Sequence, residues 1–182
     1  MESLHDERGG GLMSAVAENT AAMQQPDVKD LEQFLFHEAR LLDEARWQDW
    51  NDLFVENGEY WVPASHKQPD PKNHVSLIYE TDLLRAVRIK RFKHPNAFSL
   101  KPAPRSSHML SNVMLDEYDA EKNECVVSSR FLMLQYRREE QDVFGGGYTH
   151  HLKIEDEGFK IIKKRVDLIN CDAPLGNILV YF

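Results

Sequence analysis

The first strong pattern in the chain is a set of apolar residues with the period of a helix. They are separated by three, four or seven positions, which places them on one face of an α-helix. The residues on this face are Leu31, Phe34, Leu35, Leu42 and Ala45. Asp27 precedes them and is of a residue type that caps helix N-termini. The pattern therefore predicts a first helix near residues 28–45.

The same period continues over residues 47–54 and predicts a second, short helix. The pair Asn57-Gly58 is typical of a helix end. Residues 58–63, with the sequence GEYWVP, have the aromatic and β-branched character of a strand. Because proline cannot donate to a sheet ladder, Pro63 is expected to end that strand.

Residues 64–74 carry prolines and asparagines and indicate a loop. Residues 77–92 again have a helical period, with Leu84 and Val87 on one side, and predict a third helix. Its other side carries a basic row, formed by Arg85, Arg88 and Arg91. We interpret this row as a solvated face, with a docking stripe for an acidic partner as the alternative. Residues 93–105 contain three prolines and indicate a long surface connection.

The second half of the chain has the pattern of an antiparallel meander. Four stretches are long enough for strands and are separated by short polar breaks, as in hairpins. They are residues 107–118, 124–138, 143–155 and 159–171. Helices followed by such strands predict an α+β domain, and sheets this long stay folded by curling around their helices. The expected fold is a cone-shaped, strongly curved, mainly antiparallel sheet wrapped around N-terminal helices.

Two short motifs in this half have structural interpretations. Residues 145–147 are three glycines without a following helix N-terminus, so we interpret them as a bulge or tight bend rather than a phosphate site. Residues 160–165, KIIKKR, mix charged and apolar side chains and predict a strand with a wet face.

Residues 1–26 contain no aromatic residue and include three consecutive glycines. Such a segment has little apolar surface to bury, and burial would not offset the conformational entropy lost on ordering, so we expect a flexible tail. The remaining residues 27–182 are expected to form a single domain. The N-terminus has no apolar stretch of signal-peptide length, which favours a cytoplasmic protein.

Charge and cysteine usage exclude several function classes. The formal net charge is −8, from 30 acidic and 22 basic side chains, which argues against nucleic-acid and membrane-surface partners. The two cysteines, Cys125 and Cys171, stand apart and form no C-x-x-C pair, so buried free thiols are expected. A Rieske cluster needs paired Cys and His motifs that this chain lacks. His150 and His151 are adjacent on a predicted strand and must point to opposite faces. We therefore predict no metal site and no cofactor site in this chain.

An acid/base pocket inside the cone is the competing hypothesis. Tyr60, His108 and His150 lie in predicted strands and could converge there with Asp49. Strict alternation along residues 107–115, however, gives the better core face to Met109, Ser111, Val113 and Leu115. His108 and Asn112 would then point outward, as candidate subunit-interface residues. The uncharged, apolar C-terminal end, with Tyr181 and Phe182, is a further candidate for an interface.

Three blocks of this sequence, in order, resemble the small (beta) subunit of bacterial aromatic-ring-hydroxylating dioxygenases. They are ARLLDEARWQDWNDLFVENGEYWVP at residues 39–63, PRSSHMLSNV at 104–113 and KIIKKRVDLINCDAPLGNILVYF at 160–182. The resemblance spans roughly residues 30–182. It implies the cone-shaped fold shared with nuclear transport factor 2 and scytalone dehydratase, in agreement with the periodicity.

The resemblance also implies a role and partners. The chain would be a structural subunit that joins a large (alpha) subunit in an α3β3 hexamer with a trimer of beta subunits. The large subunit would hold the Rieske [2Fe–2S] cluster, the mononuclear iron and the aromatic substrate. A ferredoxin and a reductase would deliver electrons from NAD(P)H to it for the reaction with O2. The alternative that stays open is a stand-alone dehydratase or isomerase using Tyr60, His108, His150 and Asp49.

Overall fold

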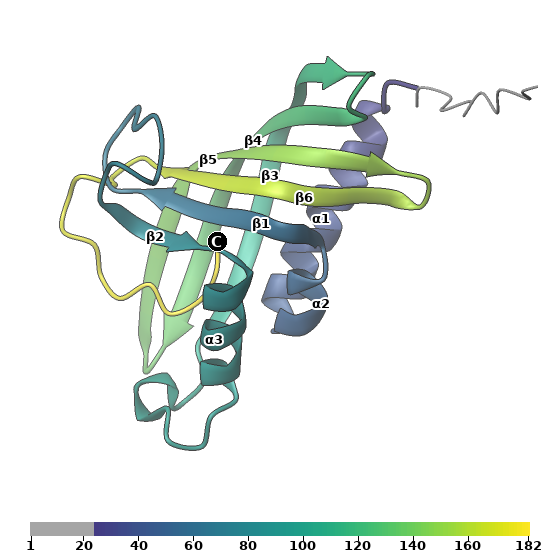
Figure 1. The fold of residues 1–182 in the computed structure, drawn as a ribbon. Coiled ribbons are helices and arrows are strands. Elements are labelled where there is room, and N and C mark those ends of the chain that lie inside the picture. Colours follow the sequence, from purple (N-terminus) through teal and green to yellow (C-terminus); the bar gives the residue numbers. More distant parts are fainter. Residues whose placement is uncertain (1–23) are drawn as a thin grey trace, which may run out of the picture.

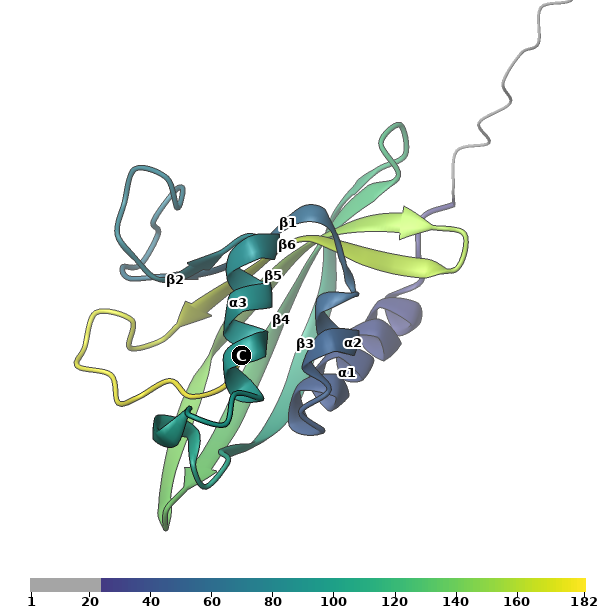
Figure 2. The ribbon, with the colours of Figure 1, turned by 60° about the horizontal axis from the view of Figure 1, so that its bottom comes forward.

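The computed structural model describes residues 24–182, which form one strongly curved six-stranded sheet with three α-helices on its concave side (Figures 1 and 2). The strands lie in the order β2-β1-β6-β5-β4-β3, and neighbours are antiparallel except for the parallel pair β1 and β6. The elements are α1 (Val28–Asp43), α2 (Trp47–Asn51), β1 (Phe54–Pro63), β2 (Ser76–Glu80), α3 (Asp82–Phe92), the 3-10 turn η1 (Phe98–Leu100), β3 (Arg105–Asp119), β4 (Glu124–Arg137), β5 (Glu140–Glu155) and β6 (Gly158–Leu168). The predicted α+β cone is confirmed.

Of the predicted tail, residues 1–26, the first 23 residues lie outside the part of the chain that the structure describes. The first helix lies where the apolar period predicted it. The second begins at Trp47 as predicted but ends at Asn51, and Phe54, Asn57 and Gly58, predicted to lie at the end of that helix, belong to β1 because this segment pairs with β6. Asp27 caps α1, since its Oδ1 accepts from the backbone N–H of Lys29 at 2.9 Å. The apolar face of α1 is buried, and α2 buries Trp47 and Trp50. No helix within residues 24–182 is long and apolar enough to cross a membrane.

The predicted third helix is wrong over its first turn. Ser76–Glu80 is the edge strand β2, which pairs antiparallel with β1 and places Glu80 opposite Tyr60. Pairing with a neighbouring strand overrides the local helical period here, because five residues cannot form a stable helix on their own but can complete a sheet edge. The helix α3 begins only at Asp82.

The predicted solvated basic row on α3 is wrong for Arg85, which is buried, and for Arg88, which is partly buried, whereas Arg91 is exposed as predicted. The Arg85 guanidinium is 1% exposed, donates to the carbonyl oxygen of Gly58 and to Asn51 Oδ1, and lies 4.0 Å from the ring centroid of Phe54. The apolar side instead faces solvent, with exposed fractions of 49–74%. These exposed residues are Leu83, Leu84 and Val87. Arginine is buried because the first turn of the helix and β1 offer it several oxygen acceptors.

The four long strands confirm the predicted meander, but the glycine triplet forms no bulge. β5 pairs with β4 without a register shift from Glu140 to Lys153. Gly146 is required for another reason, since a Cβ atom there would lie 2.0 Å from the carbonyl oxygen of Asp167 on β6. The triplet therefore permits close approach of two strand backbones at the curved end of the sheet.

A bulge occurs instead on β3 and changes which side chains face the core. Asn112 has φ 54°, and the register with β4 shifts between Ser111 and Met114. Before the bulge, the His108 side chain is only 1% exposed while Met109 is 56% exposed. The expectation that His108 points outward is therefore wrong, because one extra residue inverts the alternation along the strand.

Candidate functional site

The interior of the cone contains a buried polar cluster centred on Glu38 of α1. Glu38 Oε1 accepts from Lys164 Nζ of β6 at 2.8 Å and from Trp50 Nε1 of α2 at 3.0 Å. Glu38 Oε2 lies 3.0 Å from His150 Nε2 of β5. The side chains of Glu38, His150 and Lys164 are 0–1% exposed. Two helices and two strands thus converge on one carboxylate.

The charges of this cluster follow from burial and from its own contacts. Burial raises the pKa of Glu38, but Lys164 and His150 together outweigh burial and hold it well below its usual value. Burial lowers the pKa of His150, against the opposing effect of Glu38. Burial likewise lowers the pKa of Lys164, again opposed by Glu38. We assign an ionised Glu38–Lys164 pair beside a neutral His150.

The neutral imidazole has a defined tautomer because its Nε2–H must donate to Glu38. His150 Nδ1 is then a free acceptor, and within residues 24–182 it has no hydrogen-bond partner. The Tyr148 hydroxyl and Ser129 Oγ are likewise buried and unpartnered there, and these two residues are opposite each other on β5 and β4. A neutral histidine oriented by a carboxylate has the chemistry of a general base.

The chain's own C-terminus closes this interior. Tyr181 and Phe182 are 0% exposed. The Tyr181 ring lies 4.3 Å from that of Trp50, and its hydroxyl donates to Glu80 Oε2 at 2.9 Å. The backbone N–H of Phe182 donates to the Tyr60 hydroxyl at 3.1 Å. The C-terminus lies beside α3 (Figures 1 and 2), where Arg88 of α3 donates to the Val180 carbonyl oxygen at 3.2 Å, so the last residues form a plug in the concave face.

The residues of the predicted acid/base pocket do not come together. Tyr60 and His150 lie inside the cone. His108, in the first part of β3, is held by Asp43 at the end of α1, whose Oδ1 lies 2.6 Å from His108 Nδ1. Asp49 lies on the surface with its side chain 50% exposed and pairs with Arg46.

The predicted subunit-interface residues have different environments. Asn112 is exposed in the β3 bulge, whereas Tyr181 and Phe182 lie in the core of this chain. Their contact with another subunit stays a prediction. Cys125 and Cys171 are free and buried, as expected.

Sequence reasoning missed Glu38 and Lys164. A signal for Glu38 was present, because it lies on the buried face of α1, seven residues after Leu31 and four before Leu42. Lys164 was assigned to a wet strand face, and that interpretation is wrong for this residue, which is 1% exposed. Only the three-dimensional convergence of α1 and β6 pairs the two.

The outer face of the sheet exposes apolar side chains on neighbouring strands. Met109 of β3 is 56% exposed and lies opposite Leu132 of β4, which is 49% exposed. Val143 of β5 is 61% exposed and lies opposite Leu134. We call Met109, Leu132 and Val143 the outer apolar patch. Apolar side chains gathered on one exposed sheet face are typical of an interaction surface.

Comparisons with known proteins agree on one family. The model of the family described as "Ring hydroxylating beta subunit" matches residues 37–173. The 2-halobenzoate 1,2-dioxygenase small subunit of Burkholderia cepacia is 32% identical over 148 residues, which cover 78% of this chain and 87% of that protein. The biphenyl 2,3-dioxygenase subunit beta of Rhodococcus jostii (strain RHA1) is 30% identical over 166 residues, which cover 84% and 87%.

Solved structures show the same relationship. The beta subunit of the benzoate 1,2-dioxygenase from Burkholderia mallei ATCC 23344 has a TM-score of 0.71 and 26% identity, covering 86% of this chain and 99% of that chain. A putative scytalone dehydratase from Novosphingobium aromaticivorans has a TM-score of 0.56 and 19% identity, covering 77% and 82%. The latter similarity shows the shared fold.

Proposed function

Because the chain belongs to the ring hydroxylating beta subunit family and is thus a subunit of an aromatic-ring-hydroxylating dioxygenase, we propose that its own role is structural and non-catalytic. It braces a large subunit that holds the Rieske [2Fe–2S] cluster, the mononuclear iron and the aromatic substrate. The observation that carries this proposal is the plug. Tyr181 packs against Trp50, whose indole N–H donates to the Glu38 carboxylate that holds His150, so the last residues occupy the interior beside this cluster.

The stoichiometry we propose is three large and three small subunits, with the small subunits in contact as a trimer. The outer apolar patch supports such contacts, since exposed apolar residues on adjacent strands gain stability when another chain covers them. The exposed apolar side of α3 offers a second surface of the same character. Both surfaces lie outside the plugged interior, so assembly leaves the buried cluster undisturbed.

The reaction we propose for the whole complex is dihydroxylation of an aromatic ring. The named relatives belong to dioxygenases of 2-halobenzoate, biphenyl and benzoate, which supports an aromatic substrate for this complex too. A ferredoxin and a reductase supply electrons from NAD(P)H to the large subunit. This cofactor requirement supports action in the cytoplasm.

The experiment is co-expression with a Rieske-type large subunit from the same source. We expect the two chains to co-purify at one-to-one stoichiometry and the complex to turn over an aromatic substrate, while the small chain alone is inactive. A large subunit that assembles and reaches full activity without this chain would overturn the proposal.

Interface variants sharpen the test. Leu132→Asp and Val143→Asp place a charge on the outer apolar patch and are expected to reduce the hexamer measured by size-exclusion chromatography. Val75→Asp is the matched control, because Val75 is an 85% exposed apolar residue in the loop between β1 and β2. Equal assembly of all three variants would exclude the outer apolar patch as the interface.

The buried cluster supports a second candidate function, acid/base catalysis within the cone. The observation behind it is the unpartnered His150 Nδ1, with the Tyr148 ring 5.7 Å from the imidazole, and catalysis would require the plug to withdraw. His150→Gln in the assembled complex separates the two functions. The structural role predicts unchanged kcat per intact complex, whereas general-base catalysis predicts a loss of ~10²-fold or more.

A further inference from the structure

A cluster of three potential metal ligands lies outside the cone, where the loop between β1 and β2 meets the segment after β6. His66 comes from the loop, and Cys171 and Asp172 come from the segment. One donor atom from each lies within 4.8 Å of the other two, and His66 Nε2 is 3.7 Å from Asp172 Oδ1. We propose that these residues bind a zinc ion that clips the loop to the C-terminal segment.

The donor set fits zinc. Imidazole nitrogen, thiolate sulfur and carboxylate oxygen are the three ligand types that zinc takes in proteins, and the thiolate disfavours the harder ions magnesium and calcium. Tetrahedral zinc separates its ligand atoms by about 3.4–3.6 Å, given Zn–ligand distances of about 2.0–2.3 Å. The exposed side chains of His66 and Asp172, at 55% and 67%, are free to rotate by the ångström needed. The Cys171 thiol loses its proton to solvent as the Zn–S bond forms.

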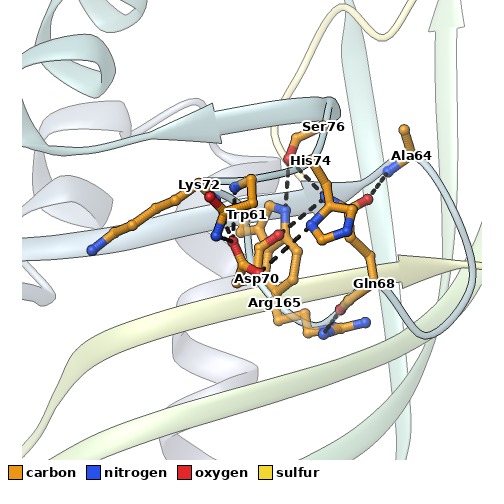
Figure 3. Close-up of polar contacts among 9 residues, drawn as sticks. Trp61, Ala64, Gln68, Asp70, Lys72, His74, Ser76 and Arg165 are labelled. Atoms are coloured by element: carbon orange, nitrogen blue, oxygen red, sulfur yellow. Dashed lines mark hydrogen bonds and ion pairs between the residues drawn. The ribbon is translucent and has the colours of Figure 1, made fainter.

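The loop is held in place before any ion binds. Gln68 is 3% exposed; its Oε1 accepts from the backbone N–H of Ala64 at 3.1 Å, and its Nε2 donates to the carbonyl oxygen of Asp70 at 3.3 Å (Figure 3). Arg165 of β6 donates to the Gln68 carbonyl oxygen at 2.8 Å and lies over the ring of Trp61. These contacts fix the loop on both sides of His66.

The same strand positions the other two ligands. β6 carries Arg165 and ends at Leu168, three residues before Cys171. Cys171 is 6% exposed and forms no disulfide, so surrounding packing restricts its thiol while His66 and Asp172 are exposed. β6 thus positions both parts of the site: Arg165 holds the loop that carries His66, and the end of the strand leads into Cys171 and Asp172. A metal site requires ligands that are held in place in this way. Three protein ligands leave a fourth position for water.

The clip would act on the plug. The segment after Asp172 runs to the buried Val180, Tyr181 and Phe182, and it has no helix or strand of its own. An ion on His66, Cys171 and Asp172 ties the start of this segment to the loop and shortens the part that is free to move. The proposal stands independently of the structural role proposed above, because zinc binding is measured on this chain alone, without the large subunit.

The test uses the full-length chain after dialysis against a chelator. We expect one zinc ion per chain by elemental analysis after re-addition, and a thiolate-to-cobalt charge-transfer band in the near-ultraviolet on titration with Co²⁺. Cys171→Ala and His66→Ala should each abolish stoichiometric zinc and the band. Zinc should raise the Tm of the unmodified chain and leave that of Cys171→Ala unchanged.

Two variants serve as matched controls. Cys125→Ala removes the other buried thiol, and His74→Ala removes the exposed imidazole that pairs with Asp70 in the same loop. Both should retain the ion and the band. The proposal is overturned if the chelated chain takes up no stoichiometric zinc, if the cobalt complex lacks a thiolate band, or if the controls lose the ion as fully as Cys171→Ala.

Discussion

Glu38 and Lys164 form a fully buried ion pair, with 2.8 Å between Oε1 and Nζ and 1% exposure of each side chain. The pair joins α1 to β6 through the interior of the cone. Trp50 and His150 occupy the remaining hydrogen-bonding positions of the carboxylate. Two desolvated charges are tolerated here because each has its partner, and the loss of one leaves the other uncompensated.

Removing the lysine alone should therefore be strongly destabilising. We expect Lys164→Met to lower the free energy of unfolding by about 3–5 kcal/mol, measured by urea denaturation. Lys163→Met is the control, since Lys163 makes a 3.7 Å, partly exposed pair with Glu59 that should contribute about 0–1 kcal/mol. The double variant Glu38→Gln/Lys164→Met should recover part of the loss, because the glutamine carbonyl oxygen can still accept from Trp50 while no charge is left unpaired. Similar effects at positions 163 and 164 would contradict a stabilising role for the buried pair.

The buried histidine predicts a pH dependence of stability. Its pKa in the folded chain is lowered by burial from the ordinary 6.5, so the unfolded chain binds a proton there at a higher pH than the folded chain does. The free energy of unfolding should thus fall as the pH drops below about 6.5 towards the lower folded pKa. Urea titrations across this window measure the slope. His150→Gln should reduce the slope, and the part that remains is expected from His151, whose pKa is also lowered by burial.

The C-terminal plug should contribute much of the stability of the domain. Phe182 is 0% exposed and packs against Phe131 and Phe144, with ring centroids 6.0 and 5.3 Å away. We expect Phe182→Ala to lower the free energy of unfolding by about 3–5 kcal/mol. Ile169→Ala, at a position 72% exposed, should change it by less than about 0.5 kcal/mol.

The plug also bears on assembly. Deletion of residues 178–182 should weaken the hexamer, and size-exclusion chromatography measures this. The physical reason is loss of the domain's interior packing, in addition to any contact that Tyr181 makes with another subunit. A truncated chain with unchanged Tm and unchanged hexamer would refute both contributions.

Hydrophobic periodicity predicted the elements whose structure depends on local pattern. α1 and the four long strands follow their own apolar spacing, and the cone follows from their order. The predictions fail where contacts with a segment distant in sequence determine the local structure. Residues 76–80 form a strand because β1 lies beside them, and one extra residue at Asn112 inverts the faces of β3. Neither strand pairing nor a bulge produces a regular spacing of apolar residues, so periodicity cannot predict them.

The buried cluster was less accessible to sequence reasoning for a similar reason. A carboxylate on an apolar helix face indicates an internal partner, but 126 residues separate Glu38 from Lys164. His150 was identified as a pocket candidate because it lies in a predicted strand that could converge with Tyr60 and His108 inside the cone. What the residue types could not show is that the C-terminus covers the cluster, since an apolar terminus is equally consistent with burial in its own domain or in a partner.

The glycine of β5 that faces β6 gives the sharpest test of the sheet's curvature. A Cβ atom at Gly146 would lie 2.0 Å from the carbonyl oxygen of Asp167, which is main chain and cannot rotate away. Gly146→Ala must therefore separate β5 from β6 where the sheet curls around the plug, and overpacking of this kind costs about 1–3 kcal/mol or more.

The matched control for this substitution is Gly176→Ala. A Cβ atom at Gly176 meets only Asp142 Oδ1, at an ordinary 3.9 Å, so its free energy of unfolding should be unchanged or slightly higher. Both variants are measured by urea denaturation alongside near-ultraviolet circular dichroism, which reports the packing of Tyr181 and its aromatic neighbours. If Gly146→Ala matched the control in both measurements, the close approach of the two strands would not be a determinant of the cone.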